Sequence, residues 1–383
     1  MAIAQKTFND YLDDAKEMAY EVSKVTDRIE RERMIPPEIT NQMKDRGLFR
    51  LLMPRSLDGA ELDHPSFLRL VFEFGKADAS VGWCFNQNNV FATNSTRLPG
   101  KASREIWTDW RNVVTNGPPT RDTLATPVDG GYRLTGRWNF SSGSPHATWL
   151  AALTPIKDSI PSEIRVLLIP KNKATMIDTW DVHGLRGTGS HGFEVNDLFV
   201  PGHLSYNQSD TPREPGSLYK INTTLFFCSG FATVALGAAR TALDAAVEMS
   251  TSKIPTNAPG QVTLRDMGTV QRQIGQAEAI WGAARAYLHE NHSRLWESAN
   301  KDQPIPTADR IGVRLASTHA IRQAAEVVDI AYNLIGSTAI FGSSPVQRRF
   351  RDIHVITQQV QGQMYHYDTA GQFFLGMEPQ GSI

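Results

Sequence analysis

The sequence predicts an α+β protein in three parts: an N-terminal helical domain, a central β domain and a C-terminal helical domain. Three observations lead to this prediction. Apolar residues recur at helical spacings of three and four in the first third of the chain. Short alternating segments with turns between them fill the middle, and the helical spacing then returns. We therefore expect domains over 1–112, 113–218 and 219–383.

The first domain opens with an apolar stripe that runs from Phe8 to Ile29, which predicts one long helix with Thr7 as its N-cap. The Pro36–Pro37 pair then begins a shorter helix, which Gly47 would end. A further helix is expected from Pro65 to about Ala77.

The alternation of apolar and polar side chains predicts the strands of the second domain. Residues 132–140 place Tyr132, Leu134, Trp138 and Phe140 on one face, which is typical of a half-buried strand. Residues 164–170 and 193–200 read as further strands. Because no helices lie between these strands, we expect a small antiparallel barrel or sandwich.

The third domain returns to long helices. Residues 225–249 are rich in Gly and Ala, which allows helices to pack closely. Apolar stripes over 264–288 and 311–335 predict two more long helices. Long antiparallel helices of this kind form a four-helix bundle.

Composition excludes several classes of protein. The chain has 39 Lys+Arg against 40 Asp+Glu, so it lacks the basic excess of a nucleic-acid binder. No apolar run reaches the ~18 residues that span a bilayer, and the charged start of the chain has no apolar signal core. Two cysteines make no disulfide framework. We expect a soluble cytoplasmic protein that binds neither nucleic acid nor membrane.

Two turns rich in small residues are the candidate ligand sites. Residues 187–192 spell G-x-G-x-x-G, but a strand pattern follows them where a dinucleotide fingerprint needs a helix. We expect a turn there, which could still offer backbone N–H groups to a ligand. Residues 138–146 end a strand in serines and glycine, so they form either an ordinary turn or a site that hydrogen-bonds a flat heterocycle.

The histidines show no metal-ligand spacing, and we predict no metal site. His146, His191 and His354 lie near the small-residue turns or in the C-terminal segment. Each can be structural or part of a substrate site.

In order, these motifs resemble the acyl-CoA dehydrogenase superfamily over nearly the whole chain. The segments KADASVGW (76–83), WNFSSG (138–143), GLRGTGSHGFEVNDLFVP (184–201) and GSTAIFGSSPVQRRFRDIH (336–354) carry the resemblance. The last three are similar to the two-component flavin-dependent monooxygenases of this fold, which act on phenols, indoles and dibenzothiophene.

The resemblance implies an oxygenase component that takes reduced FMN or FAD from a separate flavin reductase. O2 would form a C4a-hydroperoxyflavin, which oxygenates a small aromatic or heterocyclic substrate. Relatives of this kind are homotetramers. Ser141 matches the catalytic hydroxyl that faces flavin N5. The other positions implied to bind flavin are Trp138, Ser142, Gly143, Lys253, Gln347 and Arg348.

The related phenol hydroxylases carry histidine at two positions where this chain, by the resemblance, has another residue. These are Phe91 and Gln359, whereas His354 is retained. We expect His354 and Gln359 to be catalytic, and Phe91, His146 and His191 to contact the substrate. An N- or S-oxygenase, or a non-catalytic member of the fold, is an alternative.

A true acyl-CoA dehydrogenase is the other alternative. Its carboxylate base would fall on Gln361 or Val360, and neither side chain can accept a proton.

Overall fold

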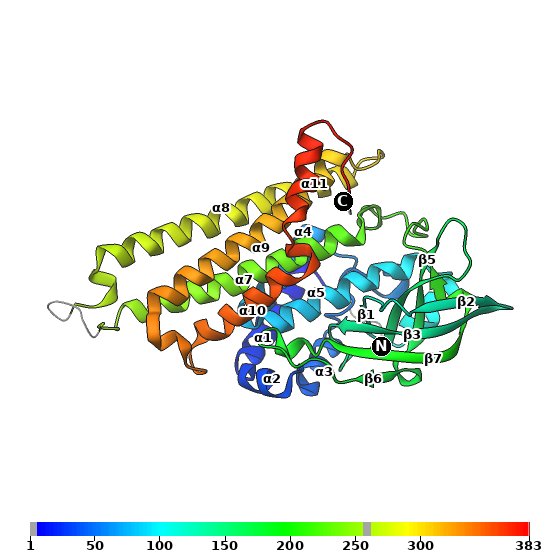
Figure 1. Cartoon of the computed structure of the whole chain (residues 1–383), viewed down its shortest axis with the longest axis horizontal. Coiled ribbons are helices and arrows are strands. Elements are labelled where there is room, and N and C mark those ends of the chain that lie inside the picture. Colours follow the sequence, from blue (N-terminus) through cyan, green and yellow to red (C-terminus); the bar gives the residue numbers. More distant parts are fainter. Residues whose placement is uncertain (1–5, 256–261, 382) are drawn as a thin grey trace. The chain divides into compact units, whose positions relative to one another are not determined.

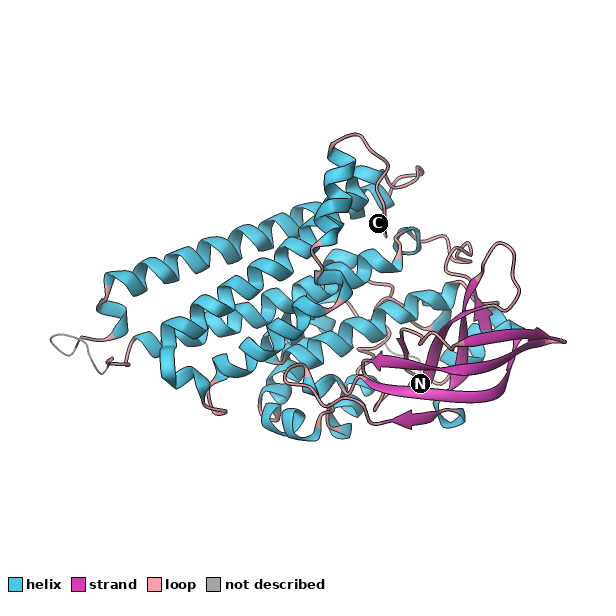
Figure 2. Cartoon of the chain, in the orientation of Figure 1, coloured by secondary structure: helices cyan, strands magenta, loops and turns pink. Residues whose placement is uncertain are grey.

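The computed structural model describes residues 6–255, 262–381 and 383. Helices come first, strands follow and long helices end the chain, as the sequence predicts (Figures 1 and 2). The chain divides into two compact units, which we describe separately. The first unit is 1–67, 83–182 and 186–223; the second unit is 68–82, 183–185 and 224–383. The division into three domains stays a prediction.

The N-terminal region contains α1 (Phe8–Ser23), α2 (Thr26–Glu32), α3 (Pro37–Asp45), α4 (His64–Ala77), α5 (Ala79–Thr93) and α6 (Gly100–Trp107). Thr7 caps α1 as predicted, since its side chain accepts a hydrogen bond from the backbone N–H of Asp10. The single helix expected over 8–29 is wrong, because the chain leaves the helix after Ser23 and restarts at Thr26. The apolar stripe continues across the break because periodicity reports burial rather than an unbroken backbone.

The end of α3 follows the predicted pattern. Gly47 adopts a left-handed φ of 75°, and the N–H of Leu48 donates to the carbonyl of Met43. This is the geometry that favours glycine after a helix.

Helix α5 was not predicted. All 15 of its residues are buried. A helix buried on every side has no apolar stripe with a polar side opposite, so the spacing rule cannot detect it.

The strands form two four-stranded sheets in the first unit, with orders β1-β4-β5-β8 and β2-β3-β7-β6. Their bounds are β1 Val114–Gly117, β2 Leu124–Val128, β3 Gly131–Ser141, β4 Trp149–Pro155, β5 Ile164–Pro170, β6 Thr175–Ile177, β7 His191–Pro201 and β8 Ser205–Tyr206. The three predicted strands are confirmed as β3, β5 and β7. The antiparallel expectation is wrong for β1 and β4, which pair in parallel because the chain passes through β2 and β3 before β4 returns beside β1.

Strand β3 contains a bulge that decides the geometry of its end. The register shifts between Trp138, which pairs with Phe193, and Ser141, which pairs with His191. Phe140 has a left-handed φ of 56° and is 62% exposed. The expectation that Phe140 shares a buried face with Trp138 is therefore wrong, because the bulge breaks the alternation.

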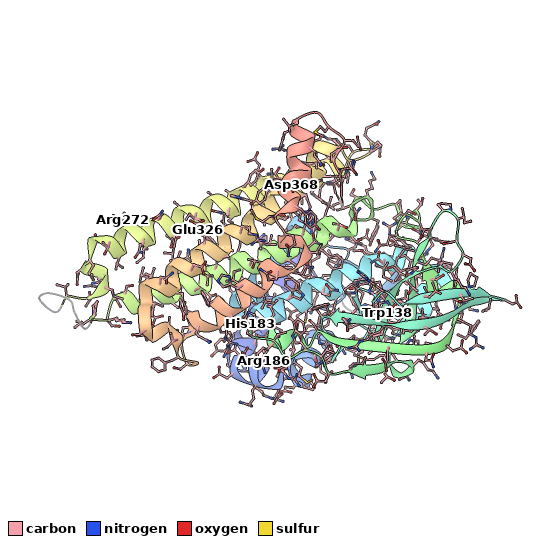
Figure 3. The ribbon with its side chains drawn as sticks, viewed as in Figure 1. Trp138, His183, Arg186, Arg272, Glu326 and Asp368 are labelled. Atoms are coloured by element: carbon pink, nitrogen blue, oxygen red, sulfur yellow. The ribbon has the colours of Figure 1, made fainter. Side chains whose placement is uncertain are left out.

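Trp138 lies among the strands in Figure 3 and is fully buried. Its ring stacks on Phe193 at 4.9 Å between centroids. Its indole N–H donates to the carbonyl of Leu153 in β4 at 2.9 Å, which joins the two sheets.

The second unit contains α7 (Thr223–Ser250), α8 (Gly268–Ala299), α9 (Thr307–Ile335), α10 (Pro345–Gln358) and α11 (Tyr365–Phe374), which confirms the long helices (Figure 1). The Gly/Ala-rich segment packs closely, as predicted. A Cβ on Gly237 would lie 2.8 Å from the carbonyl carbon of Gly75. Arg240 of α7 pairs with Glu278 of α8 at 2.8 Å.

Helix α7 is long and apolar enough to cross a membrane by length and composition alone. No such stretch was identified from the sequence, because polar residues interrupt the apolar runs of α7. In the folded chain, 83% of the most apolar 18-residue stretch of α7 is buried. That burial is typical of the core helix of a folded domain.

Candidate active site

The two small-residue turns meet in the first unit. The end of β3 lies beside the start of β7, where Ser141 pairs with His191. The N–H of Gly143 donates to the carbonyl of Thr188 at 2.8 Å, and the Ser144 hydroxyl donates to the carbonyl of Gly189 at 2.9 Å. A strand, not a helix, follows residues 187–192, as predicted. The structure thus brings together the predicted positions Ser141, Ser142, Gly143, His146 and His191.

A chain of buried hydroxyls fixes the two turns. The indole N–H of Trp83, from α5, donates to Ser142 Oγ at 3.1 Å. Ser142 Oγ lies 2.8 Å from Ser190 Oγ, which lies 2.7 Å from Thr188 Oγ1. Buried polar networks whose members are all paired rigidify the groups that they join.

Ser141 differs from its neighbours because its hydroxyl is buried and has no hydrogen-bond partner among the described residues. Leaving such a group unpaired costs about 1–3 kcal/mol. A Cβ on Gly117 would lie 2.6 Å from Ser141 Oγ, so glycine is needed beside it. The Ser141 hydroxyl therefore keeps a hydrogen bond available for a ligand.

The backbone of the turn is also constrained. Gly143 has a left-handed φ of 78°, and a Cβ there would lie 3.0 Å from the His146 ring. Only glycine satisfies both conditions, so no side chain stands between residue 143 and the His146 ring.

His146 is held as a neutral ring. Its Nε2 lies 3.0 Å from Asn88 Oδ1, and its ring stacks on Phe49 at 5.5 Å. Burial, with the nearby cations Lys44 and Lys171, lowers the pKa of His146 to about 3. A histidine with this pKa is neutral near pH 7 and orients its neighbours rather than exchanging protons.

His191 and Phe91 have different surroundings. His191 Nδ1 lies 3.2 Å from Asp178, and Asp178 also binds the guanidinium of Arg33 at 2.6 Å. Desolvation lowers the pKa of His191, although Asp178 opposes the shift. Phe91 is a buried residue of α5, eight positions or about 12 Å along the helix from Trp83, so it lies away from the turns.

The remaining predicted residues belong to the second unit. The Lys253 ammonium donates to Thr338 Oγ1 at 2.6 Å and to the carbonyl of Ile335 at the end of α9. Arg348 is buried near the start of α10, and the Gln347 side-chain carbonyl is buried without a partner among the described residues.

His354 and Gln359 lie at the other end of α10. His354 Nε2 lies 2.9 Å from Asp329. Gln359 Oε1 accepts the N–H of Gln361 at 2.7 Å, so its side chain closes the turn after the helix. The proposed roles of both residues stay predictions.

Trp83 and the amides of α5 were not predicted as site residues from the sequence. Thr188, Ser190 and Phe140 lie in the two candidate turns, but none of them was given a role in the site. Phe140 projects beside Trp180 in an edge-to-face contact at 6.1 Å. A usable signal was present: residues 86–89 form a run of four amide side chains in an otherwise apolar stretch. Buried amides in such a run need partners or a ligand.

Gln361 is one of the two positions, with Val360, at which the resemblance would place the base of an acyl-CoA dehydrogenase. Its side-chain carbonyl accepts a hydrogen bond from the buried Arg314. An amide in this position can hold an arginine but cannot remove a proton.

Comparison with known proteins decides the family. The model for the acyl-CoA dehydrogenase N-terminal domain matches residues 8–104, and that for the C-terminal domain matches residues 229–363. Indole-3-acetate monooxygenase from Pseudomonas putida is 31% identical over 353 residues, covering 91% of this chain and 90% of that protein. This chain belongs to the flavin-dependent monooxygenases of the acyl-CoA dehydrogenase superfamily. The motifs had predicted this family, and the assignment is confirmed.

Other relatives of this monooxygenase agree. The oxygenase component of an FADH2-dependent resorcinol hydroxylase from a Rhizobium strain is 26% identical, covering 92% of this chain and 90% of that protein. The HsaA monooxygenase from Mycobacterium tuberculosis superposes with a TM-score of 0.90 at 25% identity, covering 98% of this chain and 99% of that chain. The chain is thus a flavin-dependent oxidoreductase with the fold of this superfamily.

Proposed function

We propose that this monooxygenase is the oxygenase component of a two-component system that oxygenates a small aromatic or heteroaromatic substrate. A separate flavin reductase supplies reduced FMN or FAD. When bound, reduced flavin provides the two electrons that split O2, so that one oxygen atom enters the substrate and the other leaves as water. The relatives named above act, by their names, on indole-3-acetate and resorcinol.

The turn at the end of β3 is the observation that carries this proposal. The unpaired hydroxyl of Ser141 would donate to the edge of the flavin ring, and the backbone of Ser142 and Gly143 would line the same edge. The exposed ring of Phe140, which contacts Trp180, would cover the flavin, and Trp138 would support the strand from the sheet core. These residues fit a flat heterocycle because they combine an aromatic surface with a few fixed polar groups.

We infer a substrate that is electron-rich in its neutral form, because His146 beside the turn is a hydrogen-bonded neutral ring whose lowered pKa makes it a poor base for a phenol. His191 lies against Asp178 beside Ser141, and it would be the base if the substrate were a phenol. Oxygen transfer to nitrogen or sulfur is the alternative outcome of the same chemistry.

We also propose that the protein acts as a homotetramer in the cytoplasm, away from membranes. Support for assembly comes from exposed apolar side chains near the C-terminus, among them Met364, Tyr365, Phe374 and Leu375.

We further propose that the two sheets form a sandwich and that the long helices form a four-helix bundle. The Trp138–Leu153 hydrogen bond supports a sandwich of the two sheets, and the long helices α7 to α10 support a four-helix bundle.

The test measures flavin binding and oxygen insertion separately. Purified protein is titrated anaerobically with reduced FMN and reduced FAD, and then mixed with 18O2 and indole. We expect binding of one reduced flavin and product that carries 18O. Failure to bind either reduced flavin, or product without 18O, would overturn the proposal. Reduction of bound flavin by an acyl-CoA would establish the dehydrogenase instead.

Ser141→Ala tests the assignment of the turn. Loss of one hydrogen bond should weaken reduced-flavin binding by about tenfold, which is ~1.4 kcal/mol, and should raise the yield of H2O2 relative to product. The matched control is Ser23→Ala, which removes an exposed hydroxyl at the end of α1. Equal affinities for Ser141→Ala and the control would remove Ser141 from this role.

A further inference from the structure

Three asparagines on α5 differ in what their amides contact. Asn88 donates to the carbonyl of Val114 at 3.1 Å and lies 3.0 Å from His146 Nε2. Asn89 donates to the carbonyls of Leu48 and Phe85 at 2.9 and 3.0 Å, and it accepts the N–H of Leu51 at 2.9 Å. Asn86 is fully buried, yet neither its amide nitrogen nor its amide oxygen has a partner among the described residues.

A buried amide without partners destabilises the fold through both its nitrogen and its oxygen. The group has two N–H donors and a carbonyl that can accept two hydrogen bonds. No described contact pairs with either atom, and a buried amide left unpaired costs free energy. The two neighbouring asparagines show that α5 can satisfy such groups, so the state of Asn86 calls for a partner that the chain itself does not supply.

The position of Asn86 points to that partner. Asn86 follows Trp83 by three residues and precedes Val90 by four, so the three side chains lie on one face of α5. Trp83 donates to Ser142 at 3.1 Å, beside Ser141. The amide is therefore about one helical turn from the residue that fixes the serine turn. The unpaired amide thus lies close to the turn to which the proposed function assigns the flavin.

We propose that Asn86 anchors the substrate, its carbonyl oxygen accepting a hydrogen bond from a ring N–H or a phenolic O–H. This inference rests on the proposed oxygenase function and names the substrate class that it selects. The amide holds the polar hydrogen without removing it, since an amide is not a base near pH 7. A site built to bind such a hydrogen discriminates strongly against an analogue that lacks it.

The test compares two probes of nearly the same shape. Indole carries a ring N–H, whereas benzothiophene has sulfur in its place. Equilibrium affinities are measured by calorimetry without flavin turnover. We expect the wild-type protein to bind indole at least about tenfold more tightly. Asn86→Leu should bind both probes equally, with its affinity for benzothiophene unchanged within about twofold. A wild-type protein that binds both probes alike, or neither, overturns the proposal.

Asn89→Leu is the matched control, because it removes an amide whose hydrogen bonds are all made within the fold. We expect it to lower the melting temperature, whereas Asn86→Leu should leave the melting temperature unchanged or raise it. If Asn86→Leu does not fold, Asn86→Ala takes its place. A variant at position 86 that melts early and still prefers indole would show that the amide is structural, and would overturn the proposal.

The two proposals can fail separately. Wild-type protein that prefers indole but inserts no 18O contradicts the oxygenase function. Wild-type protein that oxygenates indole while the Asn86 variants keep its preference over benzothiophene contradicts only the anchoring role.

Discussion

At the scale of single residues, burial sets the chemistry of the histidines. His146 has a pKa of about 3 in the folded protein because desolvation and two nearby lysines disfavour its charged form. Its pKa in the unfolded chain is about 6.5. Between these values the unfolded state binds more protons, so the free energy of unfolding falls as pH falls from 6.5 toward 3. Above pH 6.5 the contribution of His146 to the free energy of unfolding is constant.

Replacing His146 with glutamine should therefore flatten this dependence. The glutamine side chain has no proton to gain, so the variant should lose about 1.4 kcal/mol per pH unit of slope between pH 6 and pH 5. Urea unfolding at pH 7.5, 6 and 5 measures the slope. His292, whose pKa burial also lowers to about 3, remains in both proteins as an internal reference. Equal slopes in the two proteins would show that His146 is not neutral in the fold.

At the scale of elements, the sequence predicted what periodicity can report. The long stripes of α1, α8 and α9 and the alternation of β3 were found, since each leaves a regular apolar pattern. The short helix α6 was not predicted, although it buries one face. Helix α5 left no pattern because it is buried on every side. Phe140 was misplaced because a single left-handed residue shifts the alternation of β3. The break after Ser23 was hidden because the buried stripe continues through it.

The candidate site was predictable only in part, for a similar physical reason. Ser141, Ser142 and Gly143 stand in a contiguous motif, so one segment of sequence contains them. The partners that fix them, Trp83 and Ser190, come from other elements and meet the turn only through the fold. Hydrogen bonds between distant segments leave no spacing that one sequence can show.

The bulge of β3 gives a prediction at this scale. A β-branched residue is disfavoured at the left-handed φ of position 140 by about 1–2 kcal/mol. Phe140→Val should therefore unfold at lower urea concentration than Phe140→Gly. The control is Phe199 of β7, which is also exposed but has no positive φ. There the valine variant should be the more stable, because valine favours strands over glycine. The same order at both positions would contradict the bulge.

At the scale of the whole molecule, the order of motifs was more informative than any one of them. The glycine-rich segment 187–192 alone predicts a turn, because a strand follows where a dinucleotide fingerprint needs a helix, and the serine segment alone fits an ordinary turn. Their order between two helical regions identified the superfamily. The charge balance of the chain then fits a protein whose ligands are a flavin and a small organic molecule.

Assembly is the remaining prediction at this scale. The outer face of α8 carries Gly268, Gly275 and Gly282 at intervals of seven residues, and a Cβ on any of them would meet nothing within 4 Å in the described chain. Gly275 is an exposed glycine in the interior of the helix, where glycine costs about 1 kcal/mol relative to alanine. A close contact with another copy would offset that cost. Gly275→Ala should stabilise the isolated chain by about that amount.

Gly275→Lys should leave the fold intact, because a Cβ at this position meets no atom of the described chain within 4 Å. It should separate the subunits, because a close interface along this face of α8 would have no room for the lysine side chain. Sedimentation velocity measures the assembly, and circular dichroism checks the fold. Gln276→Lys is the matched control, since it adds the same charge to an exposed position about 100° around the helix. We expect the wild-type protein and Gln276→Lys to sediment as tetramers and Gly275→Lys as a smaller species. A folded Gly275→Lys tetramer would contradict an interface along this face of α8.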